Sequence, residues 1–382
     1  MGKGGKYLAK KAPVAKKKKK KVLPVILITL LVIVLLCVGG GILYYNYLIS
    51  MISRPDKVVK EPVATQAVIE AVETEQTEEP TVGETSPEET WPEIIPDKNI
   101  SNILLIGQAA REGEEALIAD TMILCSINRE TKTLTMTSFM RDMCLVWPEY
   151  IDYQGKSHTG NNRINMAYNM GYRWANNNVQ GGMDVLSNII EYNFGVPVDH
   201  CVEVNFELFD EVMNLLGGIE VELSEEELNY LKENYPGSKR VWTLEPGLCE
   251  LSPYLTLGYA RMRKVGHGDY ERTERQRTVI TKLIEKLRDK NILEINKLFL
   301  TVLPKITTDM TNKEITNYAF EFIPMLKDLN IQSQRIPFDG NETSISREYD
   351  GYTDWMIAPR DLKATAKQLQ ESIGMVTAET TN

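Results

Sequence analysis

The sequence has few histidines and cysteines, the residues that most zinc sites and thiol-dependent enzymes use. Its 382 residues include three histidines and five cysteines. His158, His200 and His267 match no zinc-protease spacing, and the cysteines have no paired spacing, so no zinc site is predicted. No Gly-x-Ser-x-Gly sequence occurs, which argues against a serine hydrolase with a nucleophile elbow. Zinc-dependent and serine-dependent hydrolysis are therefore not favoured.

The N-terminal part begins with a segment that has no acidic residue, and this is followed by a segment that has no charged residue of either sign. Residues 1–21 contain ten lysines and no acidic residue, and residues 22–44 contain no charged residue. Twenty-three helical residues span about 34 Å, enough for a hydrocarbon core of about 30 Å. We therefore expect a cytoplasmic basic tail at 1–21 and a single transmembrane helix at 22–44, with the main domain outside the cell. A cleaved signal peptide is disfavoured because its apolar stretch has about 7–15 residues.

Residues 45–97 are expected to form a linker. From Glu61 to Asp97 there are eleven acidic residues, no basic residue and five prolines. Such a segment has too little apolar surface to fold, and its charges repel one another. It is expected to hold the following domain away from the membrane.

Residues 98–382 form the predicted extracytoplasmic domain. Removing the 13 basic and 12 acidic residues before Lys98 from the totals of 43 and 53 leaves 30 basic and 41 acidic residues. A net charge of about −11 argues against a nucleic-acid partner. The domain has four cysteines, which could form two disulfides outside the cell. Two of them, Cys125 and Cys201, lie in predicted strands and are typical of small buried hydrophobic residues.

Apolar patterns predict interleaved strands and helices. Expected strands are 102–107, 121–128, 133–139, 198–206, 219–223 and 331–336. Expected helices are 163–169, 184–192, 207–216, 270–289, 292–302 and 312–328, with one more opened by a capping box at Ser224 and Glu227. Both hairpin and crossover connections occur. The fold class is therefore α/β, a three-layer-like sandwich with a mixed central sheet flanked by helices.

The most informative segment is a group of arginines in this acidic domain. Six basic residues lie within the 17 positions 261–277. If residues 259–263 are extended, Arg261 and Arg263 point to the same side. Arg272, Arg275 and Gln276 share a face in the first turns of the following helix, where the helix dipole favours anions. The guanidinium fork suits phosphate oxygens, so a pocket for a pyrophosphate group is predicted.

The alternative is that these arginines pair with Asp269, Glu271 and Glu274 on a solvated face. A second motif favours the pocket. Arg141 and Asp142 follow a predicted strand, at the kind of position where α/β folds bind ligands, and Asp120 opens the preceding strand.

These blocks together resemble the LytR-CpsA-Psr family. The resemblance covers about residues 100–290 and rests on the order and spacing of several motifs. They are Asn102-Ile-Leu-Leu-Ile-Gly107, Asp120-Thr-Met, Ser138-x-x-Arg-Asp142, Arg163-Ile-Asn-x-Ala-Tyr168, Val204-Asn-Phe206, Leu216-Gly-Gly-Ile-Glu-Val221, Tyr259-Ala-Arg-x-Arg263 and Gly268-Asp-x-x-Arg-x-x-Arg-Gln276.

The resemblance implies transfer of a phosphorylated glycopolymer, of teichoic acid or capsule type, from a polyprenyl-pyrophosphate carrier to a peptidoglycan hydroxyl. It implies that the pyrophosphate is held by Arg141, Arg261, Arg263, Arg272 and Arg275, with Gln276 nearby. Asp120, Arg141 and Arg263 are then the expected catalytic residues. Asp120 would coordinate Mg²⁺ or orient the acceptor hydroxyl. An apolar tunnel would hold the lipid tail; residues 185–190 or 206–213 could line it, although such residues more commonly form core.

The sequence departs from the family at the first strand. Ala109 stands where the family has a carboxylate that binds metal. Glu112, Glu114 or Glu115 could replace it from the same loop. Otherwise the chain is expected to bind the lipid-linked donor but to act slowly or only as a regulator. A polyprenyl-pyrophosphate phosphatase, with water as acceptor, is a further alternative.

Overall fold

The structure is a computed structural model that describes residues 98–108, 118–349 and 352–375, with a few residues between 44 and 55. The chain divides into two units, residues 1–50 and 51–382. In the first unit the four described residues, Tyr44, Asn46, Tyr47 and Ser50, are helical. The expected span at 22–44, apart from Tyr44, and nearly all of the expected linker lie outside the described residues. No helix within the described part is long and apolar enough to cross a membrane.

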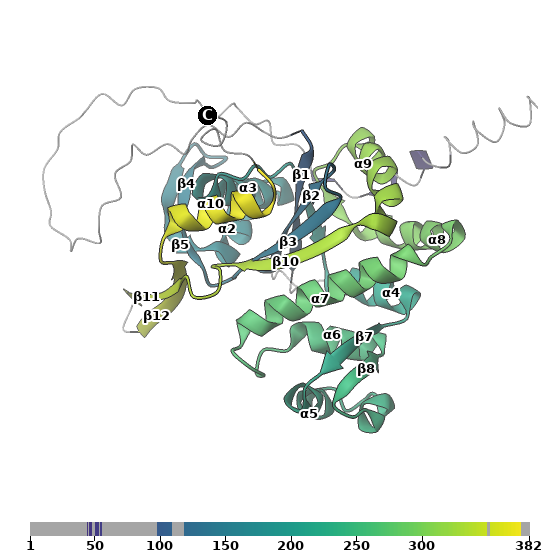
Figure 1. Ribbon diagram of the computed structural model, residues 1–382. Helices are drawn as coiled ribbons and strands as arrows, with labels where there is room; N and C mark the ends of the chain where they lie inside the picture. Colours follow the sequence, from purple (N-terminus) through teal and green to yellow (C-terminus); the bar gives the residue numbers. More distant parts are fainter. Residues whose placement is uncertain are drawn as a thin grey trace, which may run out of the picture. The chain divides into compact units, whose positions relative to one another are not determined.

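A six-stranded mixed sheet forms the centre of the second unit (Figure 1). Its strand order is β10-β3-β2-β1-β6-β9. The pairs β1–β2, β2–β3 and β6–β9 are antiparallel, whereas β1–β6 and β10–β3 are parallel. The expected mixed sheet flanked by helices is thereby confirmed. The strands are β1 Ile100–Gln108, β2 Ala119–Asn128, β3 Thr133–Phe139, β6 His200–Val204, β9 Thr307–Thr308 and β10 Asn330–Ile336.

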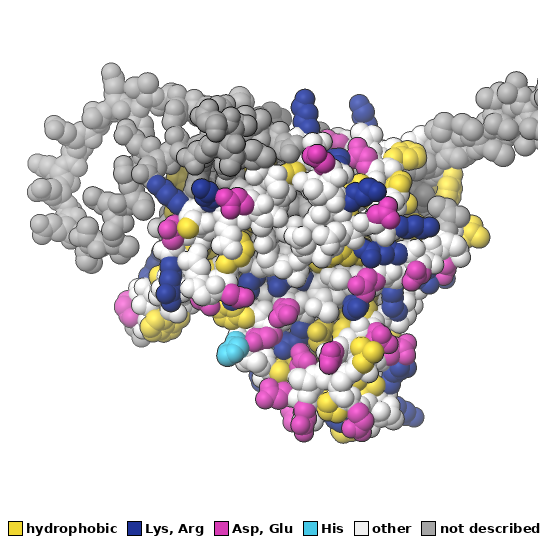
Figure 2. Space-filling model, viewed as in Figure 1, with side chains coloured by type: hydrophobic (Ala, Val, Ile, Leu, Met, Phe, Trp, Pro, Cys, Tyr) yellow, Lys and Arg dark blue, Asp and Glu magenta, His cyan; other side chains and the backbone are white. Residues whose placement is uncertain are grey.

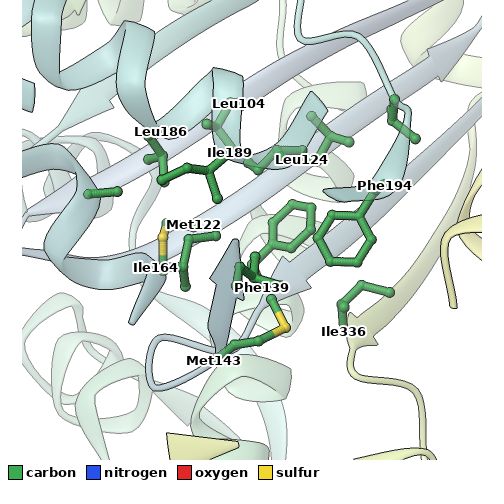
Figure 3. Packing of buried hydrophobic residues seen from close by; sticks show 14 of the residues in the cluster. Leu104, Met122, Leu124, Phe139, Met143, Ile164, Leu186, Ile189, Phe194 and Ile336 are labelled. Atoms are coloured by element: carbon green, nitrogen blue, oxygen red, sulfur yellow. The ribbon is translucent and has the colours of Figure 1, made fainter. Parts of the chain in front are cut away.

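Three helices cover one face of the sheet: α2 Ala167–Trp174, α3 Val179–Phe194 and α10 Leu362–Ser372 (Figure 1). Alternate residues of the strands, including Leu104, Met122 and Leu124, point into this main core. Figure 3 shows them packed against Leu186 and Ile189 of α3. The α3 residues 185–190 that were considered for a lipid tunnel therefore form core.

The other face of the sheet packs against α7, Asp269–Arg288. Ile123 and Met136 of the sheet contact Ile280 and Ile284 of this helix. Beyond α7 lies a smaller subdomain with its own apolar core. It contains α4 Phe206–Leu216, β7 Ile219–Leu223, α5 Glu225–Asn234, β8 Gly247–Leu251 and α6 Pro253–Arg261. Acidic side chains are frequent over this subdomain in the view of Figure 2, in keeping with the acidic composition.

The remaining elements lie around the edges of the sheet. They are the hairpins β4 Cys144–Ile151 with β5 Ser157–Arg163 and β11 Glu342–Tyr349 with β12 Tyr352–Pro359, and the helices α8 Ile292–Val302 and α9 Asn312–Met325. Short 3₁₀ turns occupy 164–166, 239–243, 303–305 and 326–328. Cys125, Cys144, Cys201 and Cys249 are free thiols, so the described cysteines form no disulfide.

Two local expectations were wrong. Residues 259–261 are not extended, because α6 continues to Arg261. The helix begins where the Ser252 hydroxyl accepts a hydrogen bond from Leu255 N and Pro253 occupies the first turn. The helix expected to start at Arg163 begins at Ala167, because Arg163 is the last residue of β5, where it pairs with Cys144.

Candidate active site

The site is built on an irregularity between β1 and β2. Gly107 pairs with Thr121 and Gln108 pairs with Ala119, so Asp120 has no partner in the ladder. An extra residue of this kind bends a strand and re-aims a side chain. Gly107 fits here because a Cβ atom at its position would lie 2.8 Å from the Thr121 Cβ. The bulge thus places the Asp120 carboxylate and its backbone carbonyl at the end of the sheet.

Three arginines from three segments meet at Asp120. Arg141 Nη1 donates to Asp120 Oδ1 at 2.9 Å, and Arg263 Nη2 donates to Asp120 Oδ2 at 3.1 Å. Arg272 Nη2 donates to the Asp120 backbone carbonyl at 3.0 Å. The expected convergence of Asp120, Arg141, Arg263 and Arg272 is therefore present.

A second carboxylate, Asp269, holds the same arginines from the start of α7. Its Oδ2 accepts from Arg141 Nε at 3.0 Å, and its Oδ1 lies 2.9 Å from Arg272 Nε and 3.4 Å from Arg263 Nε. Pairing of the arginines with Asp269, which the sequence offered as the alternative to a pocket, does occur. The pairing is not confined to a solvated face, because the Arg272 side chain is 4% exposed, although that of Arg263 is 40% exposed.

Arg272 and Arg141 stay charged in this setting. Burial lowers the pKa of Arg272 to about 10, which leaves it protonated at neutral pH. Burial also acts to lower the pKa of Arg141, but its hydrogen bond to Asp120 and the nearby carboxylates raise that pKa overall. Three guanidinium groups surround Asp120 and Asp269, Asp142 Oδ2 lies 3.4 Å from Arg141 Nε, and Arg261 in the cavity wall adds a further positive charge at this point of an acidic domain. Such a point attracts an anion.

Arg275 lies apart from this cluster. Its Nε donates to Glu227 Oε1 at 2.8 Å, and its Nη1 and Nη2 donate to the carbonyls of Met262 and Val265. The other carboxylate oxygen of Glu227 caps the start of α5. Arg275 therefore ties α7 to α5 and to the segment after α6, and it does not line the cavity described next.

A cavity of about 440 Å³ opens beside Asp120, between the sheet and the smaller subdomain. One end is polar and contains Asp120, Arg261, Arg263, Arg272 and Gln276. The Gln276 Oε1 atom is buried and has no hydrogen-bond partner among the described residues. The rest of the wall is largely apolar or aromatic: Leu105, Ile123, Phe209, Tyr230, Tyr235, Leu257, Ala260, Val279 and Ile280. The arrangement suits a ligand with an anionic head and an apolar tail.

The carboxylates give limited support for a metal. Mg²⁺ is commonly bound by one or two carboxylates together with substrate phosphates. Asp120 is the carboxylate in the described cavity wall, and both of its oxygens contact arginines. No group of three described His, Cys, Asp or Glu residues is arranged to hold a metal. Asp120 thus fits an ion held mainly by the substrate. Ala109, Arg111, Glu112, Glu114 and Glu115 lie outside the described residues.

Several residues of the site were not found from the sequence. Glu227 was recognised as a cap but not as the partner of Arg275. The aromatic rings of Tyr230 and Tyr235 come from α5 and its C-terminal end, which no motif linked to the arginines. Phe209 had been considered for an apolar tunnel and does line the cavity. The roles of Glu227, Tyr230 and Tyr235 could not be predicted from local sequence patterns, because they depend on how the smaller subdomain packs against α7.

The fold and this site define an α/β protein with an arginine-lined, amphipathic ligand cavity. Comparison with known proteins gives the family. A model of the LytR_cpsA_psr family matches residues 48–371, and the chain belongs to that family.

Two relatives and one solved structure illustrate the similarity. The chain is 32% identical over 214 residues to the polyisoprenyl-teichoic acid–peptidoglycan teichoic acid transferase TagU of Bacillus licheniformis, covering 55% of this chain and 60% of that protein. It is 25% identical over 289 residues to the corresponding TagT of Bacillus subtilis, covering 74% of this chain and 80% of that protein. The matched stretch thus spans less than two thirds of TagU. The crystal structure of protein gbs0355 from Streptococcus agalactiae has the same fold, with a TM-score of 0.57, 24% identity and coverage of 74% and 90%.

Proposed function

We propose that this chain transfers a phosphorylated glycopolymer, of teichoic acid or capsule type, from a polyprenyl-pyrophosphate carrier to a hydroxyl of peptidoglycan. The observation that carries the proposal is the cavity itself. Guanidinium groups gather at one end, and apolar side chains line the rest. A pyrophosphate joined to a long hydrocarbon has the same two-part character. The names of the TagU and TagT relatives support the same reaction.

The arginines act by binding and by charge stabilisation. In this proposal Arg141, Arg263 and Arg272 hold the pyrophosphate, with Arg261 and Gln276 at the cavity wall. They would exchange part of their present contacts with the two aspartates for phosphate oxygens. Fixed positive groups stabilise the charge that develops on oxygens during phosphoryl transfer. Arg275 contributes by fixing the start of α7.

The transfer needs no covalent enzyme intermediate. A hydroxyl oxygen of peptidoglycan attacks the phosphorus that carries the glycan, a new P–O bond forms, and the bond to the bridging oxygen breaks. Polyprenyl phosphate leaves, and the hydroxyl proton passes to a base. Asp120 is the carboxylate placed to orient that hydroxyl or to accept its proton. The buried, unpartnered Gln276 Oε1 offers a second acceptor for a hydroxyl of the substrate.

The proposal includes an Mg²⁺ ion that would be coordinated by Asp120 and by the donor phosphates. Bound there, the ion would neutralise charge on the leaving phosphate. Its affinity is expected to be weak because Ala109 cannot supply a second carboxylate.

The membrane arrangement is also proposed. The segment 22–44 would anchor the chain with its lysine-rich tail in the cytoplasm and the folded domain outside the cell. The donor's lipid tail remains near the same membrane, and the linker at 45–97 would set the distance of the cavity from it. Membrane, lipid-linked glycan and peptidoglycan are thus the expected partners, and nucleic acid is not.

The test is an assay of transfer from a short-chain lipid donor to peptidoglycan. Arg263→Ala is expected to lower transfer about 100-fold, as loss of one charge-stabilising donor does in other enzymes. Lys264→Ala is the matched control, because this neighbouring cation is exposed and does not line the cavity. Equal transfer by the wild type and Arg263→Ala would contradict the proposal.

The same assay separates the alternatives. A chain that binds the donor without transferring it would be a binder or regulator, which is consistent with Asp120 being held by two arginines. Release of polyprenyl phosphate without attachment to peptidoglycan would identify a phosphatase.

A further inference from the structure

A second cavity, of about 650 Å³, lies on the other side of α7. Helix periodicity separates the two, because Arg272, Gln276 and Val279 face the first cavity whereas Tyr270, Glu274 and Arg277 face the second. The remaining wall comes from His267 before α7, from the end of β10 and from the segment that leads into β11, including Arg335, Asp339 and Glu342. Neither the family motifs nor the proposed transfer uses these residues.

The guanidinium of Arg277 is the unusual feature of this cavity. The residue is 5% exposed, and neither its Nε nor its Nη1 has a hydrogen-bond partner among the described residues. Burying unpaired N–H groups of a charged side chain is costly, and such groups generally have a partner. A guanidinium donates two parallel hydrogen bonds to a carboxylate from one edge, either from Nε and Nη2 or from Nη1 and Nη2, so a bound carboxylate would use one of the unpartnered nitrogens together with Nη2. Arg277 is therefore arranged for an anionic group that enters the cavity.

Two carboxylates in the same wall also have unused oxygens. Glu271 Oε2 and Glu342 Oε2 are buried without a hydrogen-bond partner in the described structure. These atoms accept hydrogen bonds only, so they suit a ligand that donates N–H or O–H groups. Arg335 Nη2 lies 3.8 Å from the other oxygen of Glu342, Oε1, which is an ion pair without a hydrogen bond. Arg335 donates instead to the Pro337 carbonyl and to Asp339, and it covers the Tyr270 ring.

The balance of charge selects the ligand. The cavity wall has four acidic residues, Glu271, Glu274, Asp339 and Glu342, against Arg277 and Arg335. A phosphate or other multiply charged anion would be repelled by the carboxylates. A group with one carboxylate and one ammonium matches both the unpaired guanidinium and the unpaired carboxylate oxygens.

We propose that this second cavity binds a zwitterionic amino-acid group, with its carboxylate on Arg277 and its ammonium between Glu271 and Glu342. The group could belong to a free amino acid or to a diamino-dicarboxylic residue of the peptidoglycan peptide, whose free side-chain end presents the same ammonium and carboxylate on one carbon. The inference does not depend on the transfer reaction, because it concerns binding on the opposite side of α7.

The test is direct binding to the full chain, measured by titration calorimetry or ligand-observed NMR. Alanine is the free probe, a muropeptide with a free amine is the polymer-derived probe, and alanine methyl ester, N-acetylalanine and inorganic phosphate are controls. Saturable binding of alanine or the muropeptide is expected, with at least tenfold weaker binding of the ester, the acetylated form and phosphate. Tighter binding of the muropeptide would identify peptidoglycan as the source, and binding of alanine alone would identify the free amino acid.

Two variants complete the test. Arg277→Met is expected to abolish binding while leaving the unfolding temperature unchanged or raised, since an unpaired buried charge is replaced by an apolar chain of similar length. Glu342→Gln is expected to weaken binding of the zwitterion at least tenfold. The proposal is overturned if neither probe binds, if phosphate binds as well as alanine, or if both variants bind as the wild type does. It is also overturned if Arg277→Met unfolds the protein, because Arg277 would then be structural. These readouts involve no transfer assay, so failure here leaves the proposed function standing.

Discussion

Arg272 holds the main chain at Asp120: its Nη2 donates to the Asp120 carbonyl at 3.0 Å. The carbonyl is available because the bulge between β1 and β2 leaves Asp120 out of the ladder. The same arginine contacts Asp269 at the start of α7. The end of the sheet and the start of the helix are thus joined by one buried guanidinium.

The first prediction is that Arg275 stabilises the fold, unlike the arginines of the cavity, which are proposed to bind the ligand. Arg275→Met leaves Glu227 without its buried partner and frees two backbone carbonyls, so it is expected to cost roughly 3 kcal/mol of unfolding free energy. Denaturant unfolding measures this loss. The control is Arg240→Met, which removes an exposed ion pair with Glu250 and is expected to cost under about 1 kcal/mol. Similar losses for the two variants would contradict the structural role of Arg275.

A second prediction concerns Asp120. Asp120→Asn removes the negative charge that the cavity presents to an anion, so pyrophosphate binding measured without Mg²⁺ is expected to be retained or tightened. Transfer is expected to fall about 100-fold, because a positioned acid or base commonly contributes that much. Binding and single-turnover transfer are measured on the same samples, with Asp328→Asn as the control, because Asp328 is exposed, pairs with Lys132 and does not line the cavity. Weaker binding together with normal transfer would reverse the assigned role.

A third prediction tests the contact between α2 and α3. A methyl group at Gly181 would overlap the Ala175 side chain and the Gly171 carbonyl, so the two helices would have to separate. Gly181→Ala is expected to destabilise the protein by roughly 2 kcal/mol, the range for overpacking a core. At Gly237 the nearest atom to an added methyl is the Tyr254 hydroxyl at 3.9 Å. Gly237→Ala is therefore the control, and thermal unfolding that ranks the two variants equally would refute the packing argument.

A fourth prediction is a pH dependence at His200. Burial acts to lower its pKa, but the hydrogen bond to Asp309 and the charges of Asp309, Glu314 and Asp199 raise it above 6.5 overall. The stabilising contribution is therefore fully present below pH 6.5 and is lost as the pH rises through the raised value. Unfolding temperatures measured from pH 6 to 9 are expected to fall more for the wild type than for His200→Gln. Parallel curves would show that His200 does not carry this dependence.

Much of the fold could be predicted because its signals are local. The strand at 133–139 and the helix at 292–302 have the expected bounds, since unbroken apolar patterns mark both. The capping box at Ser224 and Glu227 is formed as expected. The start of α6 was missed because its signal, Ser252 followed by Pro253, was not weighed against the extended pattern expected for residues 259–263.

By itself, the sequence determined the alternation of strands and helices and the acidic character of the domain, and its family resemblance implied that Arg141, Arg263 and Arg272 gather near Asp120. Spacing along the chain marks the helices and strands, because side chains a few residues apart share a face. Only the tertiary structure decided that Arg275 binds Glu227, that Asp269 joins the cluster and that Arg277 faces a second cavity. Those outcomes depend on contacts between segments far apart in the chain, and each residue's partner is fixed by how α7 packs between the sheet and the smaller subdomain.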